Sequence, residues 1–249
     1  MGWISVRKAL RMFLTALSLF LMTCAPAIHF YHHVDRSVAR GDYEAAIRKL
    51  RENHHRLTGR NEVLYLLDMG LLFHYAGQPD SSIKYLLAAE RRIEELYTKR
   101  LSREAAAMLI NDNVLPYAGE DFEKVLVNVF LALDFAEKGE IDEALVEARK
   151  VDLKLRNFTA RYEGKNRYQE DPFARYLTGV LYETAGEIND AFIAYRKAYE
   201  AYQKYGKEFG VSVPRFLLDD LVRTATLMQF SEERDRFLAA GGHPYDPAT

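Results

Sequence analysis

The chain has 249 residues, with 34 Lys and Arg against 36 Asp and Glu, which gives a formal charge of −2. This balance does not favour nucleic-acid binding, which needs a concentrated basic surface. A single cysteine excludes an internal disulfide, so packing must hold the fold together, and 16 tyrosines and 14 phenylalanines supply apolar bulk. The sequence carries no phosphate-binding loop, dinucleotide fingerprint or nucleophile motif, so it indicates neither a cofactor nor an enzyme class.

The N-terminal residues are typical of a secretory signal. Three basic residues precede an apolar run over 12–22, and the only cysteine, Cys24, follows. Residues 21–24 resemble the lipobox of bacterial lipoproteins, although Thr23 stands where that signal usually has Gly, Ala or Ser. The resemblance implies cleavage before Cys24 and its lipidation, and Ala25 after the cysteine fits sorting to the outer membrane.

Three alternatives compete with this interpretation. The first is an uncleaved membrane anchor over 12–30, since a spanning helix needs about 20 apolar residues. The second is ordinary cleavage after Ala25 or Ala27, and the third is a cytosolic protein with a buried cysteine. All but the last place the remaining residues outside the cytoplasm. Removal of 1–23 would leave 31 basic against 36 acidic residues, a formal charge of −5.

Four short segments predict tight turns between helices. Each has a glycine, then acidic or amide residues, then a small residue five places after the glycine; the glycines are Gly41, Gly77, Gly139 and Gly186. Glycine suits the left-handed cap that ends a helix, and acidic or amide residues suit the first turn of the next helix. Apolar residues at intervals of three and four on both sides predict helix pairs in series.

The pattern resembles the tetratricopeptide repeat, whose period is 34 residues. Seven places before the glycine lies a small residue, which is Gly70, Ala132 or Gly179. Four places before it lies a large one, which is Phe73, Phe135 or Tyr182. Late in the second helix lies an alanine, which is Ala89 or Ala198. Glycine spacings of 36, 62 and 47 imply insertions. We therefore predict an all-α fold of antiparallel helix pairs, stacked as a degenerate tetratricopeptide-like solenoid.

A second resemblance covers about residues 111–230. The stretches 111–113, 119–128, 144–152 and 191–199 resemble an uncharacterised family of bacterial tetratricopeptide-repeat-containing lipoproteins. This resemblance implies a helical fold and a place in the cell envelope, with no established activity. Some such proteins accompany lipoproteins that activate penicillin-binding proteins, which implies an association with cell-wall synthesis. The domain prediction is a signal peptide over 1–23, a tether over 24–33, a repeat domain over 34–240 and a tail over 241–249.

Two long connections are candidate partner-binding segments. In the first, over 157–171, basic residues alternate with aromatic ones. Arginine and tyrosine are common interface anchors, and the candidates there are Arg161, Tyr162, Arg167 and Tyr168. In the second, over 100–119, the candidates are Asn111, Asp112, Asn113 and Tyr117. The alternatives are a loop packed by its own aromatics and ordinary turn chemistry.

Other residues have structural interpretations that compete with functional ones. Glu120, Asp121 and Asp171 could serve as acid and base, but Asp121 and Asp171 also suit helix N-caps, in the case of Asp121 without a full capping box. The pairs at 32–33 and 54–55 are adjacent histidines, for which we predict an exposed surface rather than a metal site. For the stripe of Tyr195, Tyr199 and Tyr202 we predict core packing.

The sequence thus predicts a membrane-tethered helical-repeat scaffold in the cell envelope. It would face the periplasm from the outer membrane and bind a protein or peptide partner, without cofactor, metal or nucleic acid. The alternative is an envelope enzyme that acts on cell-wall glycan through paired carboxylates.

Overall fold

The computed structural model describes residues 26–104, 116–161 and 171–246. These residues form helices and contain no strand. The helices are α2 (Pro26–Val38), α3 (Tyr43–Glu52), α4 (His54–Leu57), α5 (Glu62–Tyr75), α6 (Pro79–Glu104), α7 (Asp121–Glu137), α8 (Ile141–Arg161), α9 (Pro172–Thr184), α10 (Ile188–Phe209), α11 (Arg215–Leu227) and α12 (Ser231–Ala239), with a short 3₁₀ turn η2 (Gly59–Asn61) before α5.

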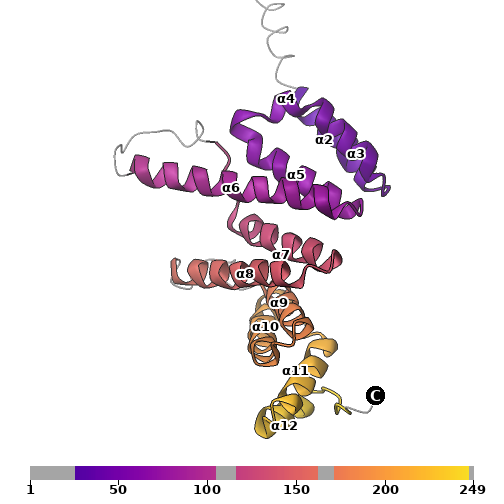
Figure 1. The fold of residues 1–249 in the computed structure, drawn as a ribbon, viewed down its shortest axis with the longest axis vertical. Helices are drawn as coiled ribbons and strands as arrows, with labels where there is room; N and C mark the ends of the chain where they lie inside the picture. The colour runs from indigo at the N-terminus through magenta and orange to yellow at the C-terminus, as the bar shows by residue number, and fades with distance from the viewer. Residues whose placement is uncertain (1–25, 105–115, 162–170, 247–249) are drawn as a thin grey trace, which may run out of the picture.

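Within this described part the helices stack as five antiparallel pairs: α2 with α3, α5 with α6, α7 with α8, α9 with α10, and α11 with α12. The pairs follow one another along the long axis of the molecule (Figure 1), and each first helix packs on the second helix of the pair before it. The apolar core is shared between neighbouring pairs, because its clusters combine residues of successive pairs. The predicted tetratricopeptide-like solenoid is therefore confirmed.

The four predicted glycines close their helices as expected. Their φ angles lie between +66° and +79°, the left-handed region that glycine adopts without steric cost. At the α5–α6 turn the Gly77 N–H donates to the His74 carbonyl at 3.0 Å, and the Gln78 N–H donates to the Phe73 carbonyl at 2.9 Å. The same two bonds recur at the other three turns. Each turn thus satisfies carbonyls that the end of the helix would otherwise leave unpaired.

A fifth turn of this kind joins α11 to α12, and the sequence pattern did not reveal it. Gln229 takes the place of the glycine at φ +58°. Its N–H donates to the Thr226 carbonyl at 3.1 Å, and the Phe230 N–H donates to the Ala225 carbonyl at 2.8 Å. The hydrogen bonds are those of the glycine turns, so the surrounding helices hold a residue with a Cβ in the left-handed conformation.

Small residues set the distance between the helices of a pair. The residue five places after each glycine is completely buried; these are Ala46, Ser82, Ala144 and Ala191. On the facing helix, a Cβ added to Gly179 would lie 2.4 Å from Cδ1 of Tyr195, and one added to Gly70 would lie 2.5 Å from Cδ2 of Leu86. Both glycines therefore permit a close approach that alanine would obstruct.

The packed region extends beyond both predicted domain limits. Phe30 and Val34 of α2 are buried in the core of the first pair, although residues 24–33 were predicted as a tether. At the other end Tyr245 packs against the core of the last two pairs, and the His243 N–H donates to Asp219 of α11 at 2.8 Å. No helix among the described residues is long and apolar enough to span a bilayer.

The fifth turn leads to a test by exchange. We expect Gly186→Gln to lower the free energy of unfolding by about 1 kcal/mol, because a side chain raises the energy of a left-handed residue. Gln229→Gly should raise it by a smaller amount, since glycine also gains entropy in the unfolded chain. No atom lies within 4 Å of a Cβ added to Gly186, so the effect there comes from the backbone alone. Urea unfolding of both variants measures it, and equal effects of the same sign would contradict this account of the turns.

Candidate functional site

A buried polar cluster joins the second pair to the third. Asn128 of α7 is fully buried, and its amide donates to Glu90 of α6 at 2.7 Å and to Glu147 of α8 at 2.5 Å. Lys150 donates to both carboxylates at 2.9 Å. Lys154 donates to the Asn128 amide oxygen at 2.5 Å and to Glu90 at 3.3 Å. Two negative and two positive charges thus balance around one amide.

Burial alone would raise the pKa of Glu90. Its hydrogen bonds from Asn128 and Lys150, and the charge of Lys154, outweigh burial and hold that pKa below its ordinary value. For Lys154 burial dominates and lowers the pKa, despite the nearby Glu90 carboxylate. A carboxylate stabilised in this way is a poor general acid, because it gives up its proton too readily. The cluster is therefore suited to holding helices in place rather than to proton transfer.

The third and fourth pairs are joined in a similar way. Asp152 of α8 accepts hydrogen bonds from the buried Arg175 of α9 and from Lys197 of α10, the latter at 3.1 Å. Arg156 forms a further ion pair with Asp152 at 2.9 Å. Burial opposes the ionised form, but the charges of Arg175 and Lys197 outweigh it and lower the pKa of Asp152.

The two clusters use the same two repeat positions. Glu90 and Asp152 each lie 13 residues after the turn glycine of their own pair, and Asn128 and Arg175 each lie 11 residues before the glycine of the next pair. The carboxylate of one second helix therefore meets a polar donor on the following first helix. We call these two contacts the polar seams.

The fourth and fifth pairs are joined by a different cluster. Arg223 of α11 donates two hydrogen bonds to Glu183 of α9, both at 2.7 Å, and one to Asp220 at 2.6 Å. Tyr195 donates to Glu183 at 2.8 Å, and Tyr176 donates to Asp220 at 2.9 Å. Burial acts against ionised Glu183, but the bonds from Arg223 and Tyr195 keep its pKa below the ordinary value. All five groups are thus engaged within the fold.

One carboxyl group shows the opposite shift. Asp68 of α5 accepts a hydrogen bond from Tyr31 of α2 at 2.8 Å, between the first and second pairs. Burial raises the pKa of Asp68 from 3.8 to about 6, the Tyr31 bond opposes the shift, and the Glu123 and Asp35 carboxylates add to it. Such a shift can mark a functional acid. Glu123 itself accepts hydrogen bonds from the Glu120 N–H and from Tyr117, so its carboxylate is already engaged in the fold.

A partly exposed apolar surface runs along the first helices of the last four pairs. It consists of residues 13 and six places before the turn residue of each pair: Leu64 and Leu71 of α5, Leu126 and Leu133 of α7, Phe173 and Val180 of α9, and Phe216 of α11. Phe173 and Phe216 are each 52% exposed, a large fraction for such side chains. At the position six places before Gln229, Arg223 ends the apolar series. We call this set the first-helix surface.

Successive first helices contact one another through residues on or beside the first-helix surface. The ring of Phe130 on α7 lies 4.9 Å from that of His74 on α5, centre to centre. Leu126 and Leu133 of α7 pack against the same buried cluster as Leu177 of α9. The rings of Tyr176 on α9 and Phe216 on α11 are 4.9 Å apart. Each first helix is therefore in side-chain contact with the next.

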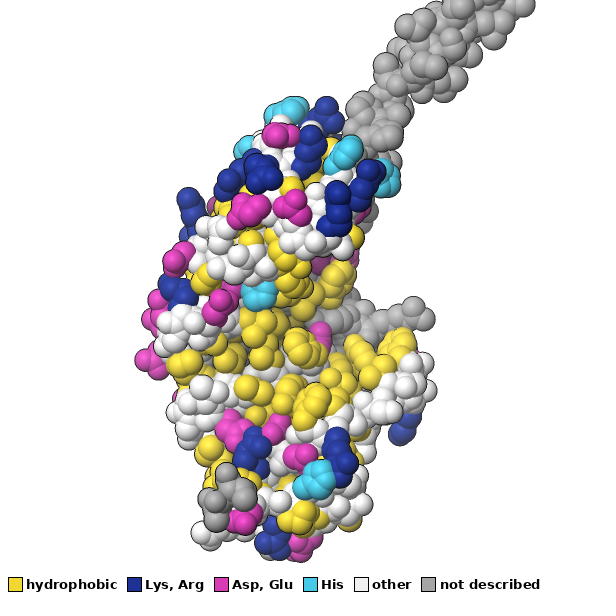
Figure 2. Space-filling model, turned by 90° about the vertical axis from the view of Figure 1, so that its right-hand side faces the viewer, with side chains coloured by type: hydrophobic (Ala, Val, Ile, Leu, Met, Phe, Trp, Pro, Cys, Tyr) yellow, Lys and Arg dark blue, Asp and Glu magenta, His cyan; other side chains and the backbone are white. Residues whose placement is uncertain are grey.

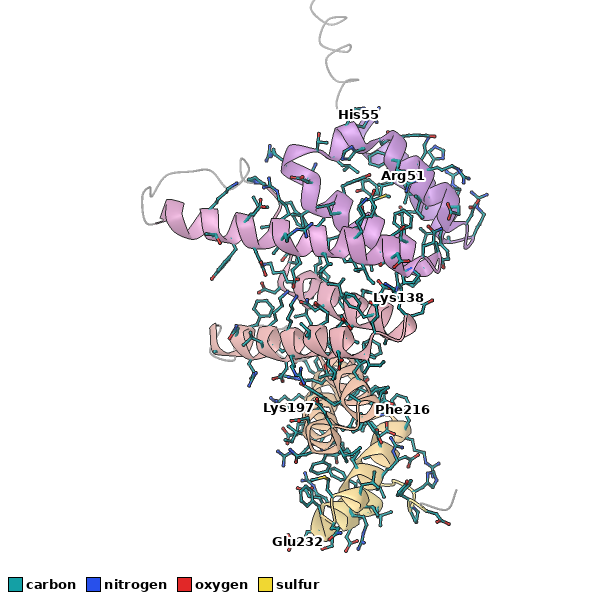
Figure 3. The ribbon with its side chains drawn as sticks, viewed as in Figure 1. Arg51, His55, Lys138, Lys197, Phe216 and Glu232 are labelled. Carbon is teal, nitrogen blue, oxygen red and sulfur yellow. The ribbon has the colours of Figure 1, made fainter. Side chains whose placement is uncertain are left out.

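The space-filling view agrees with this arrangement. On the face drawn in Figure 2, hydrophobic side chains gather across the middle of the molecule, while charged side chains predominate at its two ends. Figure 3 places Phe216 and Lys197, a member of a polar seam, on opposite sides of the lower pairs. The apolar surface and the seam thus occupy different sides of the solenoid there.

The carboxylates proposed for an enzyme lie at helix starts. Asp171 is the N-cap of α9, as predicted, and accepts a hydrogen bond from the Ala174 N–H at 2.9 Å. The prediction for Asp121 is wrong by one residue, because Glu120 is the N-cap and Asp121 is the first helical residue. The carboxylate of Glu123 accepts the Glu120 N–H at 2.7 Å, which supplies the capping-box contact that the shifted register concealed. Asp121 forms an ion pair with Lys124 at 3.2 Å.

Most predicted partner-binding residues lie outside the described residues. This holds for Asn111, Asp112, Asn113, Tyr162, Arg167 and Tyr168, and also for Cys24. Arg161 is the last residue of α8. Tyr117 is described: its N–H donates to the Arg60 carbonyl at 2.8 Å and its hydroxyl to Glu123, so it fastens the connection before α7.

The exposure predicted for the histidine pairs and the core packing predicted for the tyrosine stripe are confirmed. The histidines at 32, 33, 54 and 55 are exposed. No cluster of three possible metal ligands occurs among the described residues. Tyr195 is almost fully buried, and Tyr199 and Tyr202 pack against the same core, as predicted for that stripe.

Comparisons with known proteins support the fold. RapI in its apo form matches with a TM-score of 0.60 and 14% identity, covering 86% of this chain and 68% of its own. BtubC (BKLC) from P. vanneervenii matches with a TM-score of 0.58 and 17% identity, covering 97% of this chain and 93% of its own. A proposed kinesin light chain of Podosopora anserina with nearly identical TPR-like repeats matches with a TM-score of 0.52 and 12% identity. This match covers 85% of this chain and 90% of its own. No family model and no curated protein matches the chain. At these identities the likeness concerns the fold alone.

The raised pKa of Asp68 predicts how stability depends on pH. The folded state binds this proton more tightly than the unfolded state, so ionisation of Asp68 destabilises the fold. As the pH rises from about 4 to about 6, the free energy of unfolding of the wild type should fall relative to that of Asp68→Asn. The fall in this difference should be about 3 kcal/mol at most. Urea unfolding of both proteins between these values and neutral pH measures the difference. A difference that stays constant with pH would contradict the assignment.

Proposed function

We propose that this protein is a helical-repeat scaffold that binds a protein or peptide partner on the first-helix surface. The observation that carries the proposal is the repetition of an apolar side chain 13 residues before the turn on four stacked helices. Two of these side chains, Phe173 and Phe216, are half exposed although they are large and aromatic. Each leaves apolar area in water, which a bound partner would cover.

The arrangement suits a long partner rather than a small molecule. A solenoid presents the same position of successive repeats along one extended surface. A peptide or helix could follow that direction and place an apolar side chain against each pair. Most of the described residues that are buried and charged, by contrast, are engaged with other side chains of the fold: Glu90, Glu147 and Arg175 in the seams, Asp220 with Arg223, and one oxygen of Asp134 with His74. This supports binding over catalysis.

The proposed scaffold is held at a membrane through lipidated Cys24. The basic start, the apolar run over 12–22 and the lipobox-like end support this location. More than one acyl chain on Cys24 would make the attachment lasting, because a single chain binds only marginally. We place the protein in the outer membrane facing the periplasm, related to repeat-containing lipoproteins and linked to cell-wall synthesis. A single N-terminal membrane anchor is the alternative.

The connections before α7 and α9 are further contact candidates. The aromatic and basic residues from Arg161 to Tyr168 and the polar residues from Asn111 to Tyr117 could add contacts beside the first-helix surface. Aromatic and arginine side chains are frequent anchors at interfaces. These connections follow the second helices of pairs that contribute to the surface, so both could reach one partner.

The test compares two matched variants. Phe173→Ser with Phe216→Ser removes apolar area from the first-helix surface, and Val146→Ser with Leu153→Ser removes similarly exposed area, 49% and 51%, from the second helix α8. We expect the first variant to weaken binding of a crosslinked and purified partner at least about tenfold, as for two interface anchors. The second should bind like the wild type. Equal loss or equal retention in both would contradict the assignment of the surface.

Two further variants resolve the alternatives in the same binding assay. Alanine at Arg161, Tyr162, Arg167 and Tyr168 measures what the connection adds. Glu120→Gln with Asp121→Asn should leave binding intact and alter only helix-start terms, about 0.5–2 kcal/mol of stability. A cellular defect in the carboxylate variant, with normal folding and binding, would favour an enzyme.

A further inference from the structure

The charge of the chain is unevenly distributed along the solenoid. Residues 26–61, which form the first pair with α4 and η2, contain seven Lys and Arg against four Asp and Glu, a formal charge of +3. Residues 62–249 contain 24 against 32, a formal charge of −8. The first pair is therefore a basic end on an otherwise acidic protein.

The basic side chains of this end face solvent. The exposed residues include Arg48 of α3, Arg56 of α4, Arg60 of η2 and four histidines, His32, His33, His54 and His55. In Figure 2 Lys, Arg and His side chains gather at the upper end of the molecule, with some Asp and Glu among them. Figure 3 places His55 at the same end. We call this set of seven residues the basic end surface.

Three of the four acidic residues of this end have contacts of their own. Asp42 caps α3 by accepting the Ala45 N–H at 3.0 Å. Glu44 accepts a hydrogen bond from Gln78 of the next pair. Glu52 forms an ion pair with Lys49 at 3.0 Å. These carboxylates keep their charges and are already counted in the net charge of +3, which is therefore the excess of positive charge at this end of the solenoid.

We infer that the basic end surface rests on anionic lipid headgroups. The inference depends on the membrane tether of the proposed function, because α2 begins at Pro26, two residues after Cys24. A tether of that length leaves the first pair no room to move far from the bilayer, since a residue spans at most about 3.6 Å. Arginine close to an anionic membrane strengthens binding about fivefold per residue.

This contact would orient the solenoid. The acyl chains fix one point of the protein, and attraction of the basic end surface to the anionic lipids would fix the direction of the solenoid. Residues 62–249, with their formal charge of −8, would be repelled from the same lipids. The long axis in Figure 1 would then stand away from the membrane, with the first-helix surface facing the aqueous side. A partner could reach it without competition from lipid.

The experiment uses the full chain and two kinds of vesicle. Vesicles of phosphatidylcholine alone are compared with vesicles of phosphatidylcholine and phosphatidylglycerol, and bound protein is measured by flotation at low and high salt. We expect the wild type to prefer anionic vesicles by at least about tenfold at low salt and to lose that preference at high salt. Arg48→Gln, Arg56→Gln and Arg60→Gln together should remove the preference. Arg48→Gln alone should reduce it about fivefold.

A charge-matched control separates a surface from net charge. Lys84→Gln, Lys204→Gln and Lys207→Gln remove the same three charges from exposed positions on α6 and α10 and should leave the preference unchanged. Equal behaviour of both triple variants, or no preference in the wild type, would overturn the inference. The tether is read separately: a fatty-acid probe should label the wild type and not Cys24→Ala. Absence of label would contradict the tether, whatever the vesicles show.

Discussion

The stacking of this solenoid depends on the polar seams, in which a carboxylate of one helix pair meets a polar donor of the next. Apolar contacts stabilise the stack, but the hydrophobic effect behind them is not directional and specifies orientation less sharply than a hydrogen bond does. A buried carboxylate is different, because removal of its donor leaves an uncompensated charge and costs about 3–5 kcal/mol. Glu90 with Asn128, and Asp152 with Arg175, therefore admit few orientations. We hypothesise that the seams fix the angle between successive pairs, and that apolar replacement of a seam would keep stability while loosening this angle.

The first-helix surface is a consequence of that fixed angle. Phe173 and Phe216 lie at the same repeat position, and their side chains can serve one partner only when α9 and α11 keep a constant relation. The cluster of Glu183, Arg223 and Asp220 holds α9 and α11 in a constant relation, because it joins the last two pairs. It also places charge where the apolar series ends, at Arg223. The polar seams lie away from the binding surface, whereas this last cluster borders it, since Tyr176 bonds Asp220 and contacts Phe216.

Local features of the fold could be predicted from the sequence, whereas most features of the site could not. The glycine turns were predictable because a left-handed residue and its hydrogen bonds lie within six residues. The turn at Gln229 was missed because the packing around it, rather than its residue type, imposes φ +58°. The Glu120 cap was missed by one residue, since Asp and Glu in succession both suit a helix start. The seams join residues 23 and 38 positions apart, and their signal was the recurrence of a carboxylate 13 residues after the glycine.

The central claim is that a partner lies along the first helices, and site-specific crosslinking tests it most directly. A photo-reactive amino acid would replace Phe173 on the first-helix surface in one protein and the equally exposed Leu153 on α8 in another. The account predicts crosslinks to one partner from position 173, and none to that partner from position 153. Crosslinks from position 153 alone would contradict it, because the partner would then bind the second helices.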